Sequence, residues 1–299
     1  MSIIMYHYVR DLKKSKYPDI KGLDLTLFKE QIMYIKKHYS IISAFDLIDS
    51  IKSGSKLPQK SLLLTFDDGY SDHYLNVYPI LKNLKIPGLF FPPAKCITKN
   101  QVLDVNKIHF ILANTKNKSI VVENIYDKLD TYRSTFNLKE NKYYMDTLGK
   151  KNRFDTAEVI FIKRILQHAL PKSLRGIIIN NLFEKYVTKD EVSFSKELYM
   201  SMDNISELQK DGMYVGSHGY EHYWLNHLNT TQQQKEIELS IQFLNTIGSN
   251  TDEWIMCYPY GGYNESLLNI LMERGCIAGL TTNVGIANLR KDNFLTLPR

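Results

Sequence analysis

Short apolar runs alternate with helical patterns over the first 95 residues of the chain. Residues 2–8 are rich in Ile, Met and Tyr and predict a short buried strand. Apolar side chains recur at helical spacing over 28–35, and a second helix is predicted over 44–53, between a serine and a glycine. Residues 61–66 read SLLLTF, which is the continuous apolar run of a strand covered on both faces. These segments form βα units.

The same alternation continues beyond this strand and returns after residue 200. Further helices are predicted over 77–84, 205–212, 230–245 and 264–275, and further strands over 88–93, 214–217, 253–258 and 277–282. Repeated βα units imply a mainly parallel sheet, either closed into a barrel or left open. The fold class predicted from the pattern is therefore α/β.

Between about residues 95 and 200 the rhythm gives way to long helical patterns. Such a segment is too long for a loop, so we expect an ordered helical insertion. The chain is accordingly predicted to be a single domain over residues 1–299, interrupted by this insertion at about 95–200. Insertions at the edge where a barrel's strands end often shape the substrate pocket, and we expect the same placement for this one.

Composition suits a soluble globular protein, with 43% apolar and 23% charged residues. The N-terminus has no basic stretch before an apolar core, and no apolar run approaches the ~18 residues of a membrane span. We therefore expect neither a secretory signal nor a transmembrane segment. The three cysteines, Cys96, Cys257 and Cys276, form no disulfide framework, which favours the cytoplasm.

The net charge of +6 comes from lysines scattered along the chain. The sequence has no dense basic cluster and no zinc-finger or RNA-recognition signature, so nucleic acid is not an expected partner. A mildly basic surface suits an anionic saccharide, a nucleotide-sugar or a membrane-linked glycolipid, and it equally serves general solubility.

Two adjacent carboxylates, Asp67 and Asp68, follow the buried strand at 61–66, with Gly69 after them. In parallel βα folds, active sites are built at this carboxyl edge. Adjacent residues point in different directions, so one carboxylate can bind a metal while the other handles protons. Taken alone, the tripeptide also fits an ordinary turn.

A histidine pair follows another predicted strand, in the segment SHGYEH at 217–222. His218 and His222 are spaced i, i+4, which on a helical turn places both imidazoles on one face, where they can share a metal. The segment is not HExxH, so the metalloprotease interpretation lacks its general base. A surface pair without function is the alternative. Together with Asp68, these histidines supply the three protein ligands typical of catalytic zinc.

A third polar segment, CYPYGGYN at 257–264, follows the strand residues EWIM at 253–256. Its proline and glycines impose an unusual backbone path, which can aim a main-chain N–H at a reacting carbonyl oxygen. A plain strand-ending turn is the alternative. These three segments, in this order, resemble the polysaccharide deacetylase (NodB-homology) family, carbohydrate esterase family four. The opening MYHYV strand is also similar, especially to members associated with surface-polysaccharide biosynthesis.

The resemblance covers about residues 1–95 and 200–299 and implies an irregular, incomplete (β/α) barrel. It also implies roles for individual residues. Asp67 is the expected base, Asp68, His218 and His222 the metal ligands, and the N–H of Tyr260 part of an oxyanion hole. Expected contacts with the substrate are Tyr258, Pro259 and Trp224. The resemblance implies one divalent metal ion, zinc, with cobalt, nickel, manganese or iron as alternatives.

The sequence departs from the family pattern at two points. The arginine that commonly orients the base, two residues before the proline, is replaced by Cys257, and no histidine follows His227 to act as general acid. His7 closes the first strand, and the ordinary pKa of histidine suits proton donation at neutral pH, so it is our candidate acid; a structural hydrogen bond to a buried neighbour is the alternative. Arg299, at the end of the chain, is the candidate to orient Asp67.

The predicted function is metal-dependent removal of the N-acetyl group from an amino sugar in a polysaccharide, glycolipid or nucleotide-sugar precursor. The N-acetylated sugar is the expected partner. Two alternatives remain: a catalytically weakened sugar- or metal-binding homologue, and a hydrolase of another small acyl amide. Retention of both carboxylates favours the enzyme, since binding a metal needs only one of them.

Overall fold

The computed structural model describes all 299 residues, which form two compact units. The first unit comprises residues 1–11, 22–101 and 195–299, and the second comprises 12–21 and 102–194. The second unit contains most of the expected helical insertion and, in addition, the short segment 12–21, which the sequence pattern did not single out. That residues 1–299 are one interrupted domain stays a prediction.

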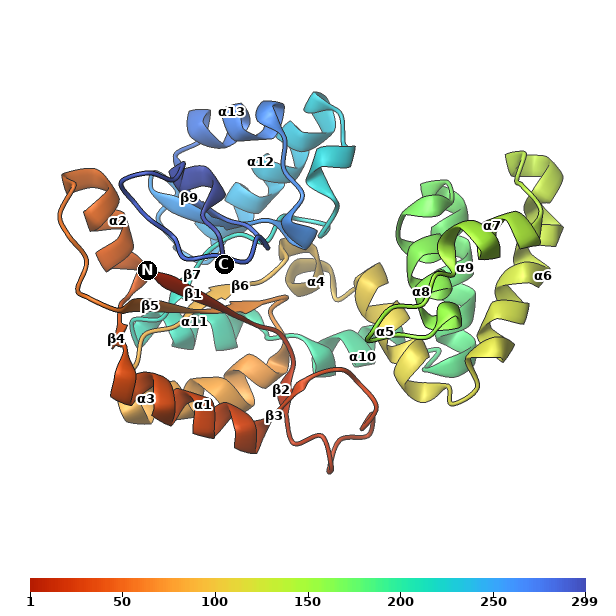
Figure 1. The fold of residues 1–299 in the computed structure, drawn as a ribbon, viewed down its shortest axis with the longest axis horizontal. Helices are drawn as coiled ribbons and strands as arrows, with labels where there is room; N and C mark the ends of the chain where they lie inside the picture. Colours follow the sequence, from red (N-terminus) through yellow and green to blue (C-terminus); the bar gives the residue numbers. More distant parts are fainter. The chain divides into compact units, whose positions relative to one another are not determined.

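The first unit is a parallel α/β structure, as the sequence predicts (Figure 1). Its strands are β1 (Ser2–Tyr6), β2 (Val9–Arg10), β3 (Leu23–Asp24), β4 (Ser40–Ile41), β5 (Ser61–Asp67), β6 (Leu89–Phe91), β7 (Tyr214–Val215), β8 (Trp254–Cys257) and β9 (Cys276–Leu280). Its helices are α1 (Leu25–His38), α2 (Ala44–Ser53), α3 (Tyr78–Leu84), α4 (Ala94–Lys99), α11 (Met202–Lys210), α12 (Thr230–Thr246) and α13 (Glu265–Glu273), with a π-helical turn, His73–Val77, leading into α3.

The second unit is helical. It contains α5 (Asp104–Asn114), α6 (Lys118–Phe136), α7 (Asn141–Leu148), α8 (Ala157–Arg164) and α9 (Lys172–Tyr186), and α10 (Glu191–Leu198) returns the chain to the first unit. Apolar side chains such as Ile125, Phe161 and Phe183 are fully or almost fully buried, so this segment has a core of its own. None of the helices in either unit combines the length and the apolar character that crossing a bilayer requires.

The sheet runs in the order β1-β5-β6-β7, with β4 also paired to β5, and every strand pair is parallel. A parallel bridge between Ser217 and Met256 links the end of β7 to β8, which pairs with β9, and a second bridge joins Leu280 to Leu297. The strands thus form the irregular, incomplete (β/α) barrel that was predicted. Parallel pairing brings their carboxyl ends to one edge.

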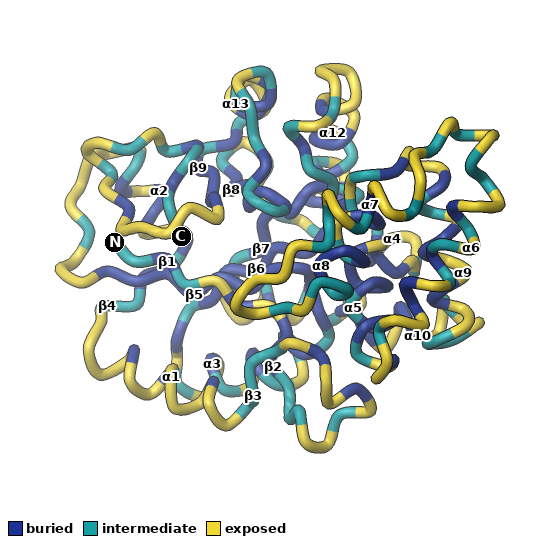
Figure 2. The backbone as a smooth tube through the Cα atoms, turned by 45° about the vertical axis from the view of Figure 1, so that its right-hand side comes forward, coloured by how far each residue is buried: buried dark blue, intermediate teal, exposed yellow.

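Strand β5 is buried along its whole length, as its unbroken apolar run indicates (Figure 2). The rings of Tyr6 and Phe90 stack on Phe66 from the neighbouring strands, with centroid distances of 5.3 and 4.9 Å. Helix α2 begins with the capping box of Ser43 and Asp46 and ends at Gly54 in the left-handed conformation, as its sequence predicts. Aromatic rings from both neighbouring strands therefore pack against the end of β5.

Stability should depend on pH through His73, a fully buried histidine whose Nε2–H donates to the His7 carbonyl at 2.9 Å. Burial lowers the pKa of His73 from 6.5 to about 4. Between pH 6.5 and about 4, the unfolded chain binds a proton on this histidine that the folded chain does not. The free energy of unfolding therefore decreases as the pH falls through this range, by up to about 3 kcal/mol. Urea unfolding at several pH values measures the effect.

The matched variants are His73→Gln, which can still donate to the same carbonyl, and His38→Gln at an exposed histidine. His73→Gln should flatten the dependence between pH 6.5 and about 4, whereas His38→Gln should leave it unchanged. Equal slopes for the native chain and His73→Gln would show that another group is responsible.

Candidate metal centre and active site

The residues with candidate chemistry lie at the carboxyl edge of the parallel strands. Asp67 is the last residue of β5 and Asp68 follows it. Three residues beyond β7 comes His218, and Cys257 is the last residue of β8. Arg299 lies two residues beyond the Leu297 bridge to the end of β9. Because the strands are parallel, segments far apart in sequence meet at this edge.

The turn after β5 turns Asp68 back toward the histidines. Asp68 has φ 72° and Gly69 φ 65°. A β-carbon at Gly69 would come within 2.6 Å of the Pro92 β-carbon, so this position requires glycine for both space and backbone conformation. Adjacent carboxylates in a regular strand would point to opposite faces, whereas this turn brings both to the same site.

The segment from His218 to His222 is a loop, and the expected helical turn is wrong. Gly219 at φ 73° and His222 at φ 57° bend the chain back on itself, and the Glu236 carboxylate accepts from the backbone N–H groups of Tyr220 and Glu221 at 3.1 and 3.0 Å. The two imidazoles nevertheless converge, with ring centroids 4.8 Å apart. A glutamate from α12 thus stabilises the geometry that the helix was expected to provide.

Asp68, His218 and His222 form a buried set of possible metal ligands, with one ligand atom of each within 4.8 Å of the others. Asp68 Oδ1 lies 3.5 and 3.2 Å from the Nε2 atoms of His218 and His222, yet it accepts no hydrogen bond. His218 Nδ1 hydrogen-bonds to the Cys257 carbonyl at 2.7 Å. With Nδ1 as the donor, the Nε2 lone pair faces Asp68, which is the usual arrangement of a metal-binding histidine.

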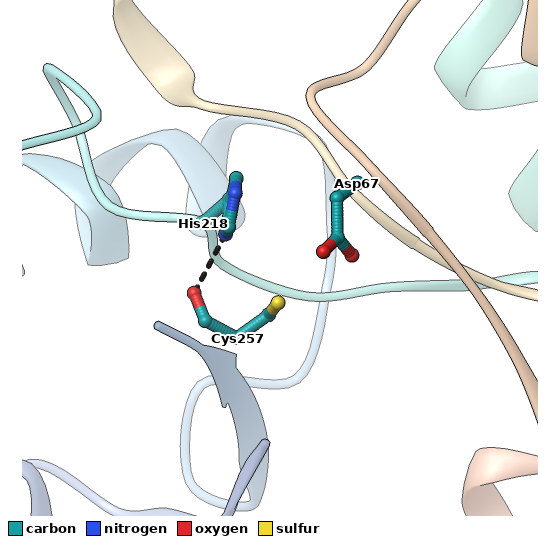
Figure 3. Close-up of side chains that lie close together, drawn as sticks. All are labelled: Asp67, His218 and Cys257. Atoms are coloured by element: carbon teal, nitrogen blue, oxygen red, sulfur yellow. Dashed lines mark hydrogen bonds between the residues drawn. The ribbon is translucent and has the colours of Figure 1, made fainter. Parts of the chain in front are cut away.

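A second possible ligand set, Asp67, His218 and Cys257, shares His218 with the first (Figure 3). It fits a cation less well because both Asp67 oxygens already accept hydrogen bonds from Arg299. The Arg299 guanidinium also places a fixed positive charge beside this set, and this charge would repel a metal ion bound there. The unsatisfied oxygen of Asp68 therefore identifies the first set as the candidate metal centre.

Arg299 binds Asp67 through both arms of its guanidinium. Nη1 donates to Oδ1 at 2.9 Å and Nη2 to Oδ2 at 2.6 Å, and both side chains are 1% exposed. Nε donates to the Thr281 carbonyl and Nη1 also to Thr65 Oγ1, each at 3.2 Å. The Arg299 side chain is thus fixed against Asp67, where the sequence analysis expected it.

The charges of the site stabilise one another. Burial by itself would raise the pKa of Asp67, but Arg299, with His218 and His7, lowers it to about 2. Burial would likewise raise the pKa of Asp68, yet the imidazoles of His218 and His222 beside its Oδ1 hold it well below its usual range. Both carboxylates are therefore ionised at neutral pH, which suits one for a cation and the other for accepting a proton.

The third segment places Tyr260 and Trp224 beside the histidines. The ring of Tyr260 stacks on Trp224 with centroids 4.6 Å apart and packs edge-on to His222 at 4.7 Å. Tyr260 has φ 57°, so the unusual main-chain path that the sequence suggested is present, and the role of its N–H as oxyanion donor stays a prediction. Pro259 is buried. Tyr258, expected to contact the substrate, is fully buried and donates its hydroxyl to the Leu295 carbonyl, so it presents no surface to a ligand.

The seven non-glycine residues with positive φ separate into two groups. Three of them, Lys85, Asn100 and Asn137, end helices in the left-handed conformation, and Lys60 lies in the turn before β5. The other three are Asp68, His222 and Tyr260. Strained backbone of this kind costs of order 1 kcal/mol or more and is characteristic of functional sites.

His7 follows β1 and has an exposed side chain, so it is accessible from solvent. Its charge contributes to lowering the pKa of both Asp67 and Asp68, which places it in the electrostatic neighbourhood of the site. Its main-chain carbonyl is fixed by His73. The role of His7 as acid stays a prediction.

Sequence reasoning missed Tyr70, the residue after the DDG turn. Its fully buried hydroxyl donates to Asp68 Oδ2 at 2.6 Å, and its ring stacks on Tyr8 at 3.9 Å. Burial, followed by the Asp68 charge, raises the pKa of Tyr70 well above its ordinary value, so the hydroxyl keeps its proton. By occupying Oδ2, Tyr70 leaves Oδ1 directed at the histidines. The only signal in the sequence was its nearness to Asp68.

The fold and the buried ligand set define a parallel α/β-barrel protein with a candidate metal site. Comparison with known families agrees: the polysaccharide deacetylase model matches residues 54–124 and 178–278, which is more than half of the chain. The chain belongs to the polysaccharide deacetylase family.

Curated relatives match shorter segments. Poly-beta-1,6-N-acetyl-D-glucosamine N-deacetylase of Escherichia coli K12 is 34% identical over 90 residues, which are 30% of this chain and 13% of the relative. Chitin deacetylase 2 of Saccharomyces cerevisiae is 32% identical over 78 residues, 26% of this chain and 25% of that protein. The matched segments thus span a small part of these relatives' length.

Solved structures match over the whole chain. The Streptococcus pyogenes deacetylase PplD, in complex with acetate, superposes with a TM-score of 0.60 at 17% identity, covering 100% of this chain and 90% of that one. A de-N-acetylase from Aggregatibacter actinomycetemcomitans gives 0.58 at 16% identity, with 100% and 93% covered. At these identities the likeness establishes the fold.

Tyr70→Phe tests whether the hydroxyl orients the metal ligand. The variant keeps the ring stack on Tyr8 and removes only the hydrogen bond to Asp68, so zinc affinity should fall about 10- to 100-fold. Calorimetric titration of the metal-free protein with zinc measures it. Tyr74→Phe, which removes a hydroxyl bonded to Glu207, is the control and should bind zinc normally. Unchanged affinity in Tyr70→Phe would exclude the orienting role.

Proposed function

We propose that this protein is a metal-dependent deacetylase that hydrolyses the N-acetyl group of an amino sugar in a polysaccharide or its precursor. The observation that carries the proposal is the division of the two adjacent carboxylates. Asp68 has an unsatisfied oxygen near two imidazoles, whereas both oxygens of Asp67 accept hydrogen bonds from Arg299. Family membership supplies the reaction class.

Asp68, His218 and His222 would hold one divalent ion, and the bound ion would polarise the amide carbonyl and acidify a water. Zinc is the proposed metal because two imidazoles and one carboxylate are a common catalytic zinc set. Burial favours neutral His218, but Cys257 and Asp68 raise its pKa well above the ordinary value. The site therefore stabilises positive charge between these side chains, which a metal ion would supply in place of the proton.

Asp67 would act as the base that takes the proton of the attacking water. Its low pKa keeps it ionised, at the expense of basicity. Arg299 occupies one lone pair on each oxygen, and a carboxylate has about four such positions, so Asp67 can still accept a proton. Arg299 thereby fixes the direction in which the base faces, which is the role that Cys257 cannot perform.

The remaining roles follow from the other groups at the edge. The main-chain N–H of Tyr260 is the proposed oxyanion donor, and His7 the proposed acid for the departing amine. An amide anion is a very poor leaving group, so its nitrogen must be protonated as the bond breaks. The partly exposed rings of Tyr260 and Trp224 offer a stacking surface for a sugar ring.

The substrate class is proposed from the relatives. The Escherichia coli relative is a deacetylase of poly-beta-1,6-N-acetyl-D-glucosamine and the Saccharomyces cerevisiae relative a chitin deacetylase, and both polymers consist of N-acetylglucosamine. We propose a polymer of this type or its carrier-linked precursor. A catalytically weakened homologue is disfavoured because Arg299 replaces the arginine missing at Cys257. The proposed location is the cytoplasm, since all three cysteines are free and buried.

The proposal is tested by measuring acetate released from a panel of oligomeric, nucleotide-linked and lipid-linked N-acetylglucosamine substrates, with formylated analogues beside them. Zinc-loaded protein should release acetate from at least one of them, and chelation should abolish the release. Release of formate alone would point to another small acyl amide. No turnover of any substrate by zinc-, cobalt- or nickel-loaded protein would contradict the proposal.

The division of the carboxylates predicts different outcomes for Asp67→Asn and His218→Ala. Asp67→Asn should keep the metal and lose about 10²- to 10⁴-fold in kcat, because a base works only during attack by water. His218→Ala should lose both metal and turnover. Metal content by mass spectrometry and acetate release measure the two effects. If Asp67→Asn also lost its metal, the two roles would be assigned wrongly.

Arg299→Ala should lower kcat about 100-fold at unchanged metal content, because it leaves the base free to rotate out of line. Arg299→Lys should recover part of the loss, since it restores the charge without the planar fork. Arg290→Ala, at an exposed arginine in the same terminal segment, is the matched control and should be fully active. Normal kcat in Arg299→Ala would exclude the positioning role.

A further inference from the structure

The net positive charge of the protein is confined to the second unit. Residues 12–21 and 102–194 contain 20 Lys and Arg against 12 Asp and Glu, a net charge of +8. The rest of the chain contains 18 against 20, a net charge of −2. The charge that looks evenly scattered in the sequence therefore belongs to one folded unit.

The connection between α7 and α8 carries a concentrated part of this charge. Within the sequence Gly-Lys-Lys-Asn-Arg-Phe at 149–154, Lys150, Lys151 and Arg153 are all exposed, and no acidic residue lies among them. Phe154 is 70% exposed, more than any other aromatic side chain of the chain. We call residues 149–154 the basic tip.

The basic tip has a defined conformation. The Asn152 side-chain oxygen accepts from the backbone N–H groups of Phe154 and Asp155 at 2.8 and 2.9 Å, and Asn152 N–H donates to the Asp155 carbonyl at 3.2 Å. Thr156 then caps α8. This turn holds Phe154 outward, and the Arg153 guanidinium lies 4.6 Å from the centre of its ring. The exposed ring is thus presented by a built turn.

Asp155, the acidic residue next to the basic tip, does not neutralise it. Its carboxylate pairs with Lys163 at 2.8 Å and also with Lys21, and its side chain is only 12% exposed. Lys21 donates in addition to the Phe154 carbonyl. The three cations of the tip therefore keep their charge on the surface, beside an exposed aromatic ring.

This combination does not match the polymer form of the proposed substrate. An N-acetylglucosamine polymer is neutral, and its deacetylated product is positively charged and would be repelled by a unit with a net charge of +8. A cationic loop with an exposed aromatic ring instead matches an anionic lipid surface, where lysine and arginine approach the headgroups and the ring enters the acyl boundary. The comparison with the polymer rests on the proposed function, whereas the match to an anionic lipid surface does not.

We propose that the basic tip attaches the protein to membrane surfaces that contain anionic phospholipids. Lys150, Lys151 and Arg153 contact the lipid phosphates, and Phe154 inserts between headgroups. Such attachment is peripheral and reversible, and salt weakens it because the charges are exposed. It would hold the enzyme where carrier-linked or nascent surface polysaccharides are found.

The test is co-sedimentation of the full chain with phosphatidylcholine vesicles, with and without phosphatidylglycerol. Binding should require phosphatidylglycerol and decrease as salt is added. Lys150→Glu combined with Lys151→Glu should weaken binding at least about 25-fold, from about fivefold per cation. Phe154→Ala should weaken it about tenfold through the lost apolar contact. The charge-matched control, Lys29→Glu with Lys37→Glu at exposed positions of α1, should bind almost as well as the native chain.

Three outcomes would overturn the proposal: no binding to phosphatidylglycerol vesicles, an equal loss of binding in the α1 control, or unchanged binding in Phe154→Ala. The last result, with competition by soluble polyphosphate, would identify a phosphate polymer as the partner. Acetate release from a soluble substrate, measured on the same variants, should not change. Vesicle binding without acetate release would leave the tip assigned and remove only the proposed function.

Discussion

Two adjacent carboxylates buried at the end of one strand are the constraint around which this site is built. Asp67 and Asp68 are 1% and 3% exposed, and burying a single ionised carboxylate without compensation is already prohibitive. Each has its own compensation. Arg299 satisfies Asp67 with two hydrogen bonds, and Asp68 receives Tyr70 on one oxygen and two imidazoles near the other.

This division of partners explains how neighbouring residues of the same type come to have different chemistry. A carboxylate already paired with a guanidinium is a poor ligand for a second cation but remains ionised and oriented. A carboxylate with an unsatisfied oxygen beside two imidazoles attracts a cation. Arg299 performs the first task, and the small Cys257 side chain stands where a family member commonly has that arginine.

Much of the fold was predictable because it depends on local patterns. The unbroken apolar run of β5, the cap at Ser43 and the glycine after α2 report burial and backbone geometry directly. The convergence of Asp68, His218 and Cys257 followed from one rule, that parallel strands end at one edge.

Other features depend on contacts between distant segments. The i, i+4 spacing of the histidines suggested a helical turn, which is absent. The 218–222 segment is a loop because the Glu236 carboxylate on α12 binds its backbone N–H groups. Tyr258 is buried with its hydroxyl bonded to the distant Leu295 carbonyl, and the Tyr70 hydrogen bond reaches an Asp68 whose φ is unusual. Inclusion of residues 12–21 in the helical unit is likewise a tertiary effect.

X-ray absorption spectroscopy of the protein loaded with one equivalent of zinc tests the central claim most directly, because it distinguishes sulfur from nitrogen and oxygen ligands. If Asp68, His218 and His222 hold the ion, the first shell contains only nitrogen and oxygen at ~2.0 to 2.2 Å, with imidazole scattering from two histidines. The result should be the same in Cys257→Ser. A zinc–sulfur distance of ~2.3 Å that disappears in Cys257→Ser would place the ion between Asp67, His218 and Cys257 and contradict the account.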